Sequence, residues 1–264
     1  MRRILASDQE WPQQLNQLDV PPTQLFIESN ESNESNEPDF SGLTSKSIAI
    51  VGSRNATPYG LRVATEFAAA LAESGYTIIS GGAFGIDAAA HRGALSVGGK
   101  TVVVLAGGVD CPYPMAHSNL FIDASKNGAL ISEHPAGTPS RKHNFLERNR
   151  IIAGLAFGTL IVEAAFKSGA IRTALDTVKL LRPVMAIPGP ISSPLSAGVN
   201  RLIAERVAEL VTSVWQIEEI VGSYGQTGQD GQNGQLMLGA DGMINPCQTQ
   251  SNQPQIFGQG LSLL

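Results

Sequence analysis

The sequence SIAIVGSRNATPY, residues 47–59, decides the fold of this chain. It begins with a run of small and β-branched residues, which is typical of a buried strand in a parallel sheet. Gly52 ends the run, Thr57 offers an N-cap hydroxyl, and Pro58 suits the first position of a helix, so a helix is predicted to start there. A strand, a glycine turn and a helix N-terminus bind anions, because unpaired N–H groups converge there, and Arg54 adds a charged fork suited to phosphate. The alternative interpretation is a plain turn with a solvated Arg54.

The order of strand, loop and helix then repeats along the chain. Strands are predicted at Ser47–Val51, Thr77–Ser80, Thr101–Leu105, Ala129–Ser132, Thr159–Val162 and Val184–Ile187. Helices are predicted from Pro58 through Leu71 and over Gly85–Val97, Met115–Lys126, Glu147–Leu155 and Ala170–Leu181. Such alternation indicates an α/β fold, in which a mostly parallel sheet carries helices on both faces. Ligands of such folds lie at the carboxyl ends of the strands.

Composition narrows the class of protein. A chain of 264 residues holds one sizeable α/β domain with appendages. It has no apolar run long enough for a membrane span and no secretory signal, so a cytoplasmic location is predicted. The two cysteines, Cys111 and Cys247, suggest neither a disulfide framework nor a metal site. A net charge of -5 argues against a protein that coats nucleic acid over its whole surface, but it allows a local basic groove.

Three regions are predicted from changes in composition. Residues 1–45 form an amino-terminal arm packed on the main body, and they include the acidic triplet repeat ESNESNESNEPD at 28–39, which is predicted to be disordered. Residues 46–221 form the α/β domain. Residues 222–264 are rich in Gly and Gln, and they are predicted to be a disordered tail.

Glycine-rich turns follow several of the predicted strands. The second strand ends in SGGAFGID at 80–87, which contains Gly82, and the third in AGGVD at 106–110. Small residues at the carboxyl ends of several strands, all on one edge of the sheet, let a ligand approach the backbone closely. The G-x-G-x-x-G fingerprint and the Walker A lysine are both absent, so the sequence supports a phosphate-bearing ligand but neither NAD nor ATP, and no cofactor is predicted.

The segment SRKHNFLERNR, residues 140–150, gathers positive charge around an aromatic ring. It holds Arg141, Lys142, Arg148 and Arg150 against a single Glu147, with Phe145 among them. Basic residues interleaved with an aromatic suit single-stranded nucleic acid, because the cations follow the phosphates and the ring stacks on a base. The alternative is a solvated charged loop with Phe145 buried in the core.

Candidates for catalysis are few. Asp87 and His91 lie four residues apart on a predicted helix, where they can pair with each other or with a cap. Glu163 stands at a strand end and can face a ligand, but no set of nucleophile, base and orienting group can be named. The four histidines lack metal-ligand spacing, so neither catalytic nor metal-binding residues are predicted and the protein is predicted not to be an enzyme.

Six motifs, in order and spacing, resemble the DNA-processing protein A family, also called Smf. They are IAIVGSR at 48–54, SGGAFGIDAAAH at 80–91, GGKTVVVLAGGVDCPYP at 98–114, ISEHPAGTPSRKHNFLERNRIIAG at 131–154, LIVEAAFKSGAIRTA at 160–174 and VMAIPGPISSPLSAGVNRLI at 184–203. The resemblance covers roughly residues 46–221. It implies an extended Rossmann-like fold that binds single-stranded DNA and forms a homodimer.

The family's role implies more about function and site. Members protect incoming single strands in natural transformation and recombination, and they help to load the RecA recombinase. The resemblance implies that Gly52, Ser53 and Arg54 form a phosphate pocket, with Gly82 in the neighbouring glycine turn, and that Lys142 and Phe145 grip the backbone and stack a base. It also implies that Arg148, Asn149 and Arg150 shape or extend the pocket, with Gly169 and Thr173 nearby.

Two departures and one rival interpretation stand beside this resemblance. Many family members carry a helical domain before the core and a winged-helix-like domain after it, and residues 1–45 and 222–264 resemble neither. Phe84 stands where a basic or aliphatic residue is common. The rival interpretation is a phosphoribohydrolase of the LOG-like type, whose G-G-x-G-T-x-x-E loop is only partly matched by Phe157–Glu163, without the leading glycine pair.

Overall fold

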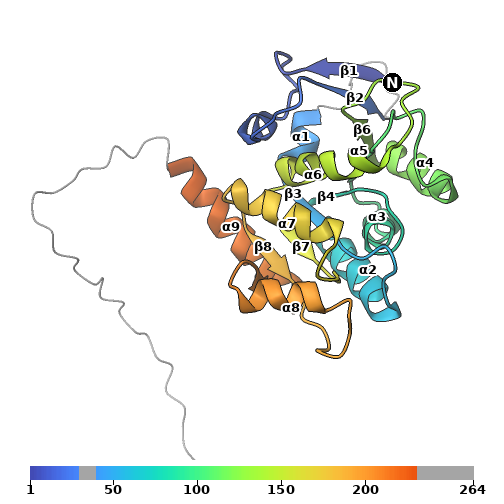
Figure 1. The fold of residues 1–264 in the computed structure, drawn as a ribbon. Helices are drawn as coiled ribbons and strands as arrows, with labels where there is room; N and C mark the ends of the chain where they lie inside the picture. The colour runs from blue at the N-terminus through green and yellow to red at the C-terminus, as the bar shows by residue number, and fades with distance from the viewer. Residues whose placement is uncertain (30–39, 231–264) are drawn as a thin grey trace, which may run out of the picture.

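The structure is a computed structural model, and it describes residues 1–29 and 40–230, apart from the side chains of 224–230. Within that part of the chain, one sheet of nine strands is flanked by helices (Figure 1). The strands are β1 Arg2–Leu5, β2 Gln24–Glu28, β3 Ser47–Val51, β4 Thr77–Ser80, β5 Thr101–Val104, β6 Gly128–Ser132, β7 Thr159–Ile161, β8 Val184–Ala186 and β9 Glu209–Leu210. The α-helices are α1 Phe40–Thr44, α2 Pro58–Glu73, α3 Ile86–Ser96, α4 Ser118–Lys126, α5 Lys142–Glu147, α6 Asn149–Leu155, α7 Gly169–Lys179, α8 Ala197–Ala204 and α9 Val214–Asp230, with 3-10 helices η1 Gln13–Gln17 and η2 Met115–His117.

The strand order locates the point where the chain reverses its direction across the sheet. The order is β1-β2-β6-β5-β4-β3-β7-β8-β9, and all pairs are parallel except β1 with β2 and β2 with β6. From β3 the chain moves outward through β4, β5 and β6, and it then returns to place β7 on the other side of β3. The topological switch point of the sheet therefore lies between β3 and β7, where ligands of such folds bind.

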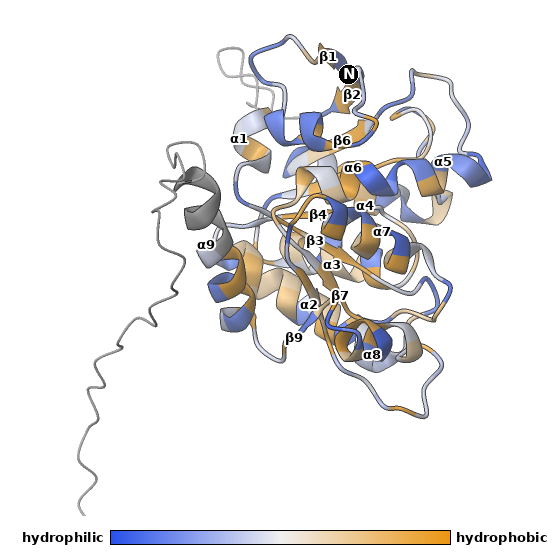
Figure 2. Cartoon of the chain, turned by 60° about the vertical axis from the view of Figure 1, so that its left-hand side comes forward, coloured by the Kyte–Doolittle hydropathy of each residue, from blue (hydrophilic) through white to orange (hydrophobic). Residues whose placement is uncertain are grey.

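The core lies on both faces of the sheet because successive side chains of a strand point to opposite sides. In β3, Ile48 and Ile50 pack with apolar residues of α2, α3 and α9, whereas Ala49 and Val51 pack with those of η1, α6, α7 and α8. All four are buried. Figure 2 accordingly shows the central strands as largely hydrophobic and the helices as mixed. This two-sided burial explains why β3 is continuously apolar rather than alternating.

The predicted α/β fold is confirmed. Each of the six predicted strands matches an observed strand to within one residue at either end, and α2 begins at Pro58 with Thr57 as its N-cap. The predicted helix over 115–126 is η2 followed by α4, and the helix predicted over 147–155 is α6, directly preceded by α5. The basic segment at 140–150 is therefore largely helical, and the interpretation as a charged loop is wrong.

The amino-terminal arm contributes more than the sequence indicated. Its strands β1 and β2 extend the sheet antiparallel beyond β6, and Trp11, Leu15 and Leu25 are fully buried. The buried guanidinium of Arg182 ties the arm to the domain, because it donates both to carbonyls at the end of α6 and to the Gln17 side chain. Both strands are short and of mixed polarity, which gives too weak a signal for a prediction from the sequence.

The carboxyl-terminal boundary also differs from expectation. Helix α9 continues to Asp230, so the first residues of the tail predicted to be disordered are helical. Most of the ESN repeat (residues 30–39) and residues 231–264 lie outside the described residues. Among the described helices, none combines the length and apolar character needed to cross a bilayer.

Candidate nucleic-acid interface

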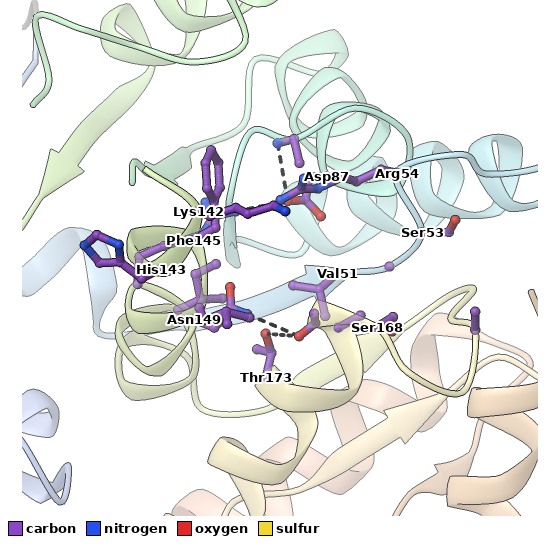
Figure 3. Close-up of a pocket in the computed structure, with 18 residues that line it drawn as sticks. Val51, Ser53, Arg54, Asp87, Lys142, His143, Phe145, Asn149, Ser168 and Thr173 are labelled. Carbon is purple, nitrogen blue, oxygen red and sulfur yellow. Dashed lines mark hydrogen bonds and ion pairs between the residues drawn. The ribbon is translucent and has the colours of Figure 1, made fainter. Parts of the chain in front are cut away.

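An open cavity of about 690 Å³ lies at the switch point between β3 and β7 (Figure 3). We call it the switch-point cavity. Its walls come from the loop after β3, the start of α3, helices α5 and α6, and the turn from β7 into α7. Among the sequence-predicted site residues, those that line it are Gly52, Ser53, Arg54, Lys142, Phe145, Arg148, Asn149, Gly169 and Thr173. Segments from four parts of the chain thus converge on one site.

The loop after β3 is held by backbone hydrogen bonds on both sides. The Ser53 N–H donates to the carbonyl of Glu163 at 2.6 Å, and the Ile86 N–H donates to the carbonyl of Ser53 at 3.1 Å. Gly52 fits only because it has no side chain, since a Cβ there would lie 2.6 Å from Cγ1 of Ile86. The glycine turn is therefore fixed between the end of β7 and the start of α3.

Glu163 anchors helix α2 instead of facing a ligand. Its carboxylate accepts hydrogen bonds from the Thr57 N–H at 2.9 Å and from the Thr57 hydroxyl at 2.6 Å. The Thr57 oxygen in turn accepts from the Gly60 N–H at 3.1 Å. Glu163 is 4% exposed, and the expectation that it faces the ligand is wrong. The carboxylate thus holds the N-cap residue of α2 by two hydrogen bonds, and its negative charge complements the dipole at the N-terminus of this helix.

Two exposed cations stand at the cavity without a carboxylate partner. Arg54 comes from the loop after β3 and Lys142 from the first turn of α5 (Figure 3). Among the described residues, neither forms an ion pair within 4.0 Å. The Arg54 guanidinium lies 5.0 Å from the ring centroid of Phe145, a cation–π distance. Both cations are available to an anion that enters the cavity.

Phe145 presents an aromatic ring to the cavity from α5. Its side chain is partly exposed, so the alternative interpretation of a core residue is wrong. The ring meets Tyr113 edge to face, with centroids 5.7 Å apart and an interplanar angle of 72°. Contacts with Arg54 and Tyr113 hold the ring in place while part of it stays open to the cavity.

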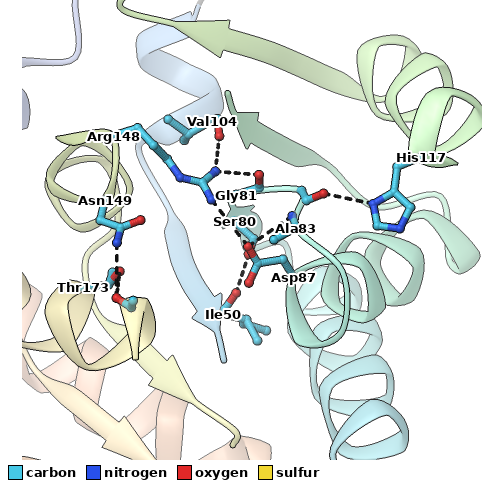
Figure 4. Close-up of polar contacts among 12 residues, drawn as sticks. Ile50, Ser80, Gly81, Ala83, Asp87, Val104, His117, Arg148, Asn149 and Thr173 are labelled. Carbon is cyan, nitrogen blue, oxygen red and sulfur yellow. Dashed lines mark hydrogen bonds and ion pairs between the residues drawn. The ribbon is translucent and has the colours of Figure 1, made fainter. Parts of the chain in front are cut away.

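Arg148 is buried beneath the cavity, and its side chain forms hydrogen bonds with backbone carbonyls (Figure 4). Its guanidinium donates to the carbonyls of Gly81 and Val104, at the ends of β4 and β5, and lies 3.9 Å from the carboxylate of Asp87. Gly81 leaves the room that this requires, since a Cβ there would lie 2.0 Å from the guanidinium. Burial lowers the pKa of Arg148 to about 10, and the charge of Asp87 opposes that shift. Arg148 therefore shapes the cavity wall.

Asp87 and His91 do not pair with each other. Burial raises the pKa of Asp87, and the opposing effects of Arg148 and the Ala83 N–H offset only part of that rise. His91 instead has its Nδ1 2.7 Å from the Thr101 hydroxyl oxygen. The helical spacing of the two residues is compatible with pairing, but Asp87 lies against Arg148 and His91 lies against Thr101 of β5.

The opposite wall is the N-terminus of α7. Ser168 caps this helix by accepting a hydrogen bond from the Ile171 N–H at 3.4 Å. The carbonyl of Gly169 accepts from Nδ2 of Asn149 at 3.2 Å and from the Thr173 hydroxyl at 3.3 Å, which joins α6 to α7 (Figure 3). Ser168 was not predicted, although a serine directly before a helical segment is an N-cap signal.

Gly82 and Arg150 are the two predicted residues that the structure places outside the cavity. Gly82 adopts a φ of +67°, and its carbonyl faces Nδ1 of His117 at 3.0 Å. Arg150 points to Glu133, with its guanidinium 2.7 Å from a carboxylate oxygen. Gly82 therefore shapes the turn after β4, and Arg150 forms an ion pair away from the cavity.

Comparison with known proteins identifies the family. The profile of a family described as DNA recombination-mediator protein A matches residues 2–222. The chain belongs to this family. A putative DNA processing protein DprA of Mycobacterium tuberculosis is 48% identical over 181 residues, which are 69% of this chain and 46% of that protein. The chain thus spans less than half of that family member's length.

Two solved structures of this recombination-mediator family have the same fold. The X-ray structure of DNA processing protein A from Streptococcus pneumoniae has a TM-score of 0.75 and 35% identity, and the match covers 82% of this chain and 72% of that one. DNA processing protein A from Helicobacter pylori, described for its single-stranded DNA binding mode, has a TM-score of 0.72 and covers 86% of this chain and 97% of that one. Its identity of 24% makes this a likeness of fold. The extended Rossmann-like fold is thereby confirmed.

Proposed function

We propose that this chain binds single-stranded DNA in the switch-point cavity. One observation supports this most directly: Arg54 and Lys142, two exposed cations that form no ion pair with any described residue, flank a partly exposed aromatic ring at the carboxyl edge of the sheet. Membership of a recombination-mediator family and the single-stranded DNA binding mode described for the Helicobacter pylori protein support the same conclusion.

The geometry gives each group a role. Phosphates meet the loop 52–54 and the Lys142 ammonium, while a base stacks on the open part of the Phe145 ring. The N-terminus of α7 faces the same space and favours negative charge. Stacking on a side chain requires a base that is not stacked inside a duplex, so this arrangement favours single strands.

The wider role follows from the family. We infer that the protein protects incoming single strands, helps to load the RecA recombinase in natural transformation and homologous recombination, acts as a homodimer and works in the cytoplasm. Arg148, Asn149, Gly169 and Thr173 keep the cavity in shape, whereas Gly82 and Arg150 are better assigned to structural roles.

The same reasoning assigns the chain no enzymatic activity. A LOG-like hydrolase would need a carboxylate free to act in the cavity. The carboxylate of Glu163 is committed to Thr57, and that of Asp87 lies against Arg148. The interpretation as a hydrolase therefore lacks the free carboxylate that it needs among the described residues of the cavity.

The test of the proposed function is fluorescence anisotropy of a labelled oligothymidylate and of a duplex of equal length across a salt series. Tight single-strand binding, weak duplex binding and a steep salt dependence are expected. Equal affinity for both, or no binding at low salt, would refute the proposal. Release of base from nucleoside monophosphates would instead support the hydrolase.

Arg54→Ala and Lys142→Ala are each expected to weaken single-strand binding and to reduce the slope of log K against log salt by about 1, because each removes one phosphate contact. The readout is the same anisotropy titration at four salt concentrations or more. Lys179→Ala is the matched control, since Lys179 lies at the other end of α7 and interacts with Asp19. Unchanged slopes in folded variants would contradict the assignment.

Phe145→Ala is expected to weaken binding by about 1 to 3 kcal/mol and to leave the salt slope unchanged, because stacking releases no counterions. Phe145→Trp keeps an aromatic face and is expected to retain most of the affinity. An altered salt slope in Phe145→Ala would mean that the ring acts mainly by positioning Arg54, with which it is in contact.

A further inference from the structure

Two exposed aromatic rings stand beside the switch-point cavity, outside its lining. Tyr113 is 52% exposed and meets Phe145 edge to face. Phe84 is 46% exposed and meets His117 edge to face, with centroids 4.6 Å apart. Tyr113 belongs to the segment 105–117 that joins β5 to α4, and Phe84 packs on His117 of that segment. Phe84 directly follows Ala83 of the cavity wall.

This segment is firmly held. His117 is buried, and its Nδ1 lies 3.0 Å from the carbonyl of Gly82. The Asp110 carboxylate accepts the Gly137 N–H at 2.9 Å, and the Cys111 N–H donates to the carbonyl of Gly108 at 2.9 Å. Tyr113 is therefore carried by a segment that its own contacts hold in place, and Phe84 packs against that segment, which lowers the entropic cost of binding.

The chemistry of this surface suits bases rather than phosphates. Residues 105–117 contain no lysine or arginine, and the negative charge of Asp110 is engaged by Gly137. Met115 adds an apolar side chain that is 72% exposed. Planar rings offer faces on which any base can stack.

We propose that Tyr113 and Phe84 form a second base-stacking platform, over which a DNA strand continues after it leaves the cavity. This rests on the proposed function and adds the path of the strand. Contact between Tyr113 and Phe145 places the platform at the rim of the cavity, so the bases that follow the short stretch held inside the cavity meet Tyr113 and then Phe84. Arg54 and Lys142 hold the phosphates at the cavity, whereas the platform adds stacking alone.

The test compares a short oligothymidylate of about 4 nucleotides with one of about 16, a range that single-strand sites span. Tyr113→Ala and Phe84→Ala are each expected to weaken binding of the longer strand about tenfold, with an unchanged salt slope, and to leave the shorter strand nearly unaffected. Tyr113→Phe retains the ring and is expected to bind both strands like the wild type. A 5-iodouracil placed in the longer strand is expected to cross-link to Tyr113 or Phe84.

Three outcomes would overturn the proposal in distinguishable ways. Equal losses for both strands in Tyr113→Ala would show that Tyr113 only supports Phe145. Wild-type binding of the longer strand by both alanine variants would show that the rings carry no bases. A wild-type protein that binds neither strand would refute the proposed function itself.

Discussion

Arg148→Ala is expected to lower the free energy of unfolding by about 3 to 5 kcal/mol, the usual cost of breaking a buried ion pair from one side. The change leaves the carboxylate of Asp87 buried without its cation, and it leaves the carbonyls of Gly81 and Val104 without this donor. Burial already raises the pKa of Asp87, and losing the cation raises it further. Urea unfolding at neutral pH, followed by circular dichroism, measures the loss.

Arg150→Ala is the matched control for this prediction, because Arg150 lies close by in the sequence, at the start of α6, and pairs with Glu133 where both side chains are partly exposed. A loss of at most about 1 kcal/mol is expected there. Arg148→Met combined with Asp87→Asn is expected to cost less than Arg148→Ala alone, because no charge is left unpaired. Similar losses for the two single arginine variants would contradict the structural role of Arg148.

Acid is expected to destabilise the protein through His91. The side chain is fully buried, and burial lowers its pKa to about 3, with nearby Arg148 contributing. Since the Thr101 hydroxyl already donates to the carbonyl of Ile78, Nδ1 of His91 is assigned as the donor to Thr101, and Nε2 has no partner within the described structure. The folded protein therefore keeps this imidazole neutral.

The sign of the effect follows from proton uptake. Between pH 6.5 and about 3 the unfolded chain binds a proton on His91 that the folded protein does not. Stability from this group is thus complete above pH 6.5 and is lost as the pH falls towards 3, by about 5 kcal/mol in all. The raised pKa of Asp87 acts in the opposite sense, because its contribution is lost as the pH rises through its folded value.

A comparison of variants separates the contribution of His91 to the pH dependence of stability from that of Asp87. His91→Gln stays neutral, so its stability relative to the wild type is expected to improve steadily as the pH falls from 6.5. His143→Gln, at an exposed position, is the matched control and is expected to follow the wild-type profile. Parallel profiles for His91→Gln and the wild type, measured by urea unfolding at several pH values, would contradict the prediction.

The arginines show where sequence reasoning reached its limit. Arg54 and Arg148 both stand in segments that suggest phosphate binding, and both line the cavity. Arg54 is exposed and forms no ion pair within the described part of the chain, whereas Arg148 is buried at the ends of β4 and β5. That difference depends on which strands neighbour the start of α6, and residue type and spacing do not carry this information.

What the sequence determined by itself was local. The apolar run before Gly52, the Thr57 cap and Pro58 specify a strand, a turn and a helix, because those preferences act over a few residues. Tertiary structure decided the rest: that β1 and β2 join the sheet, that Glu163 caps α2, and that Tyr113 meets Phe145. These contacts join residues far apart in the chain, and only the strand order brings them within reach.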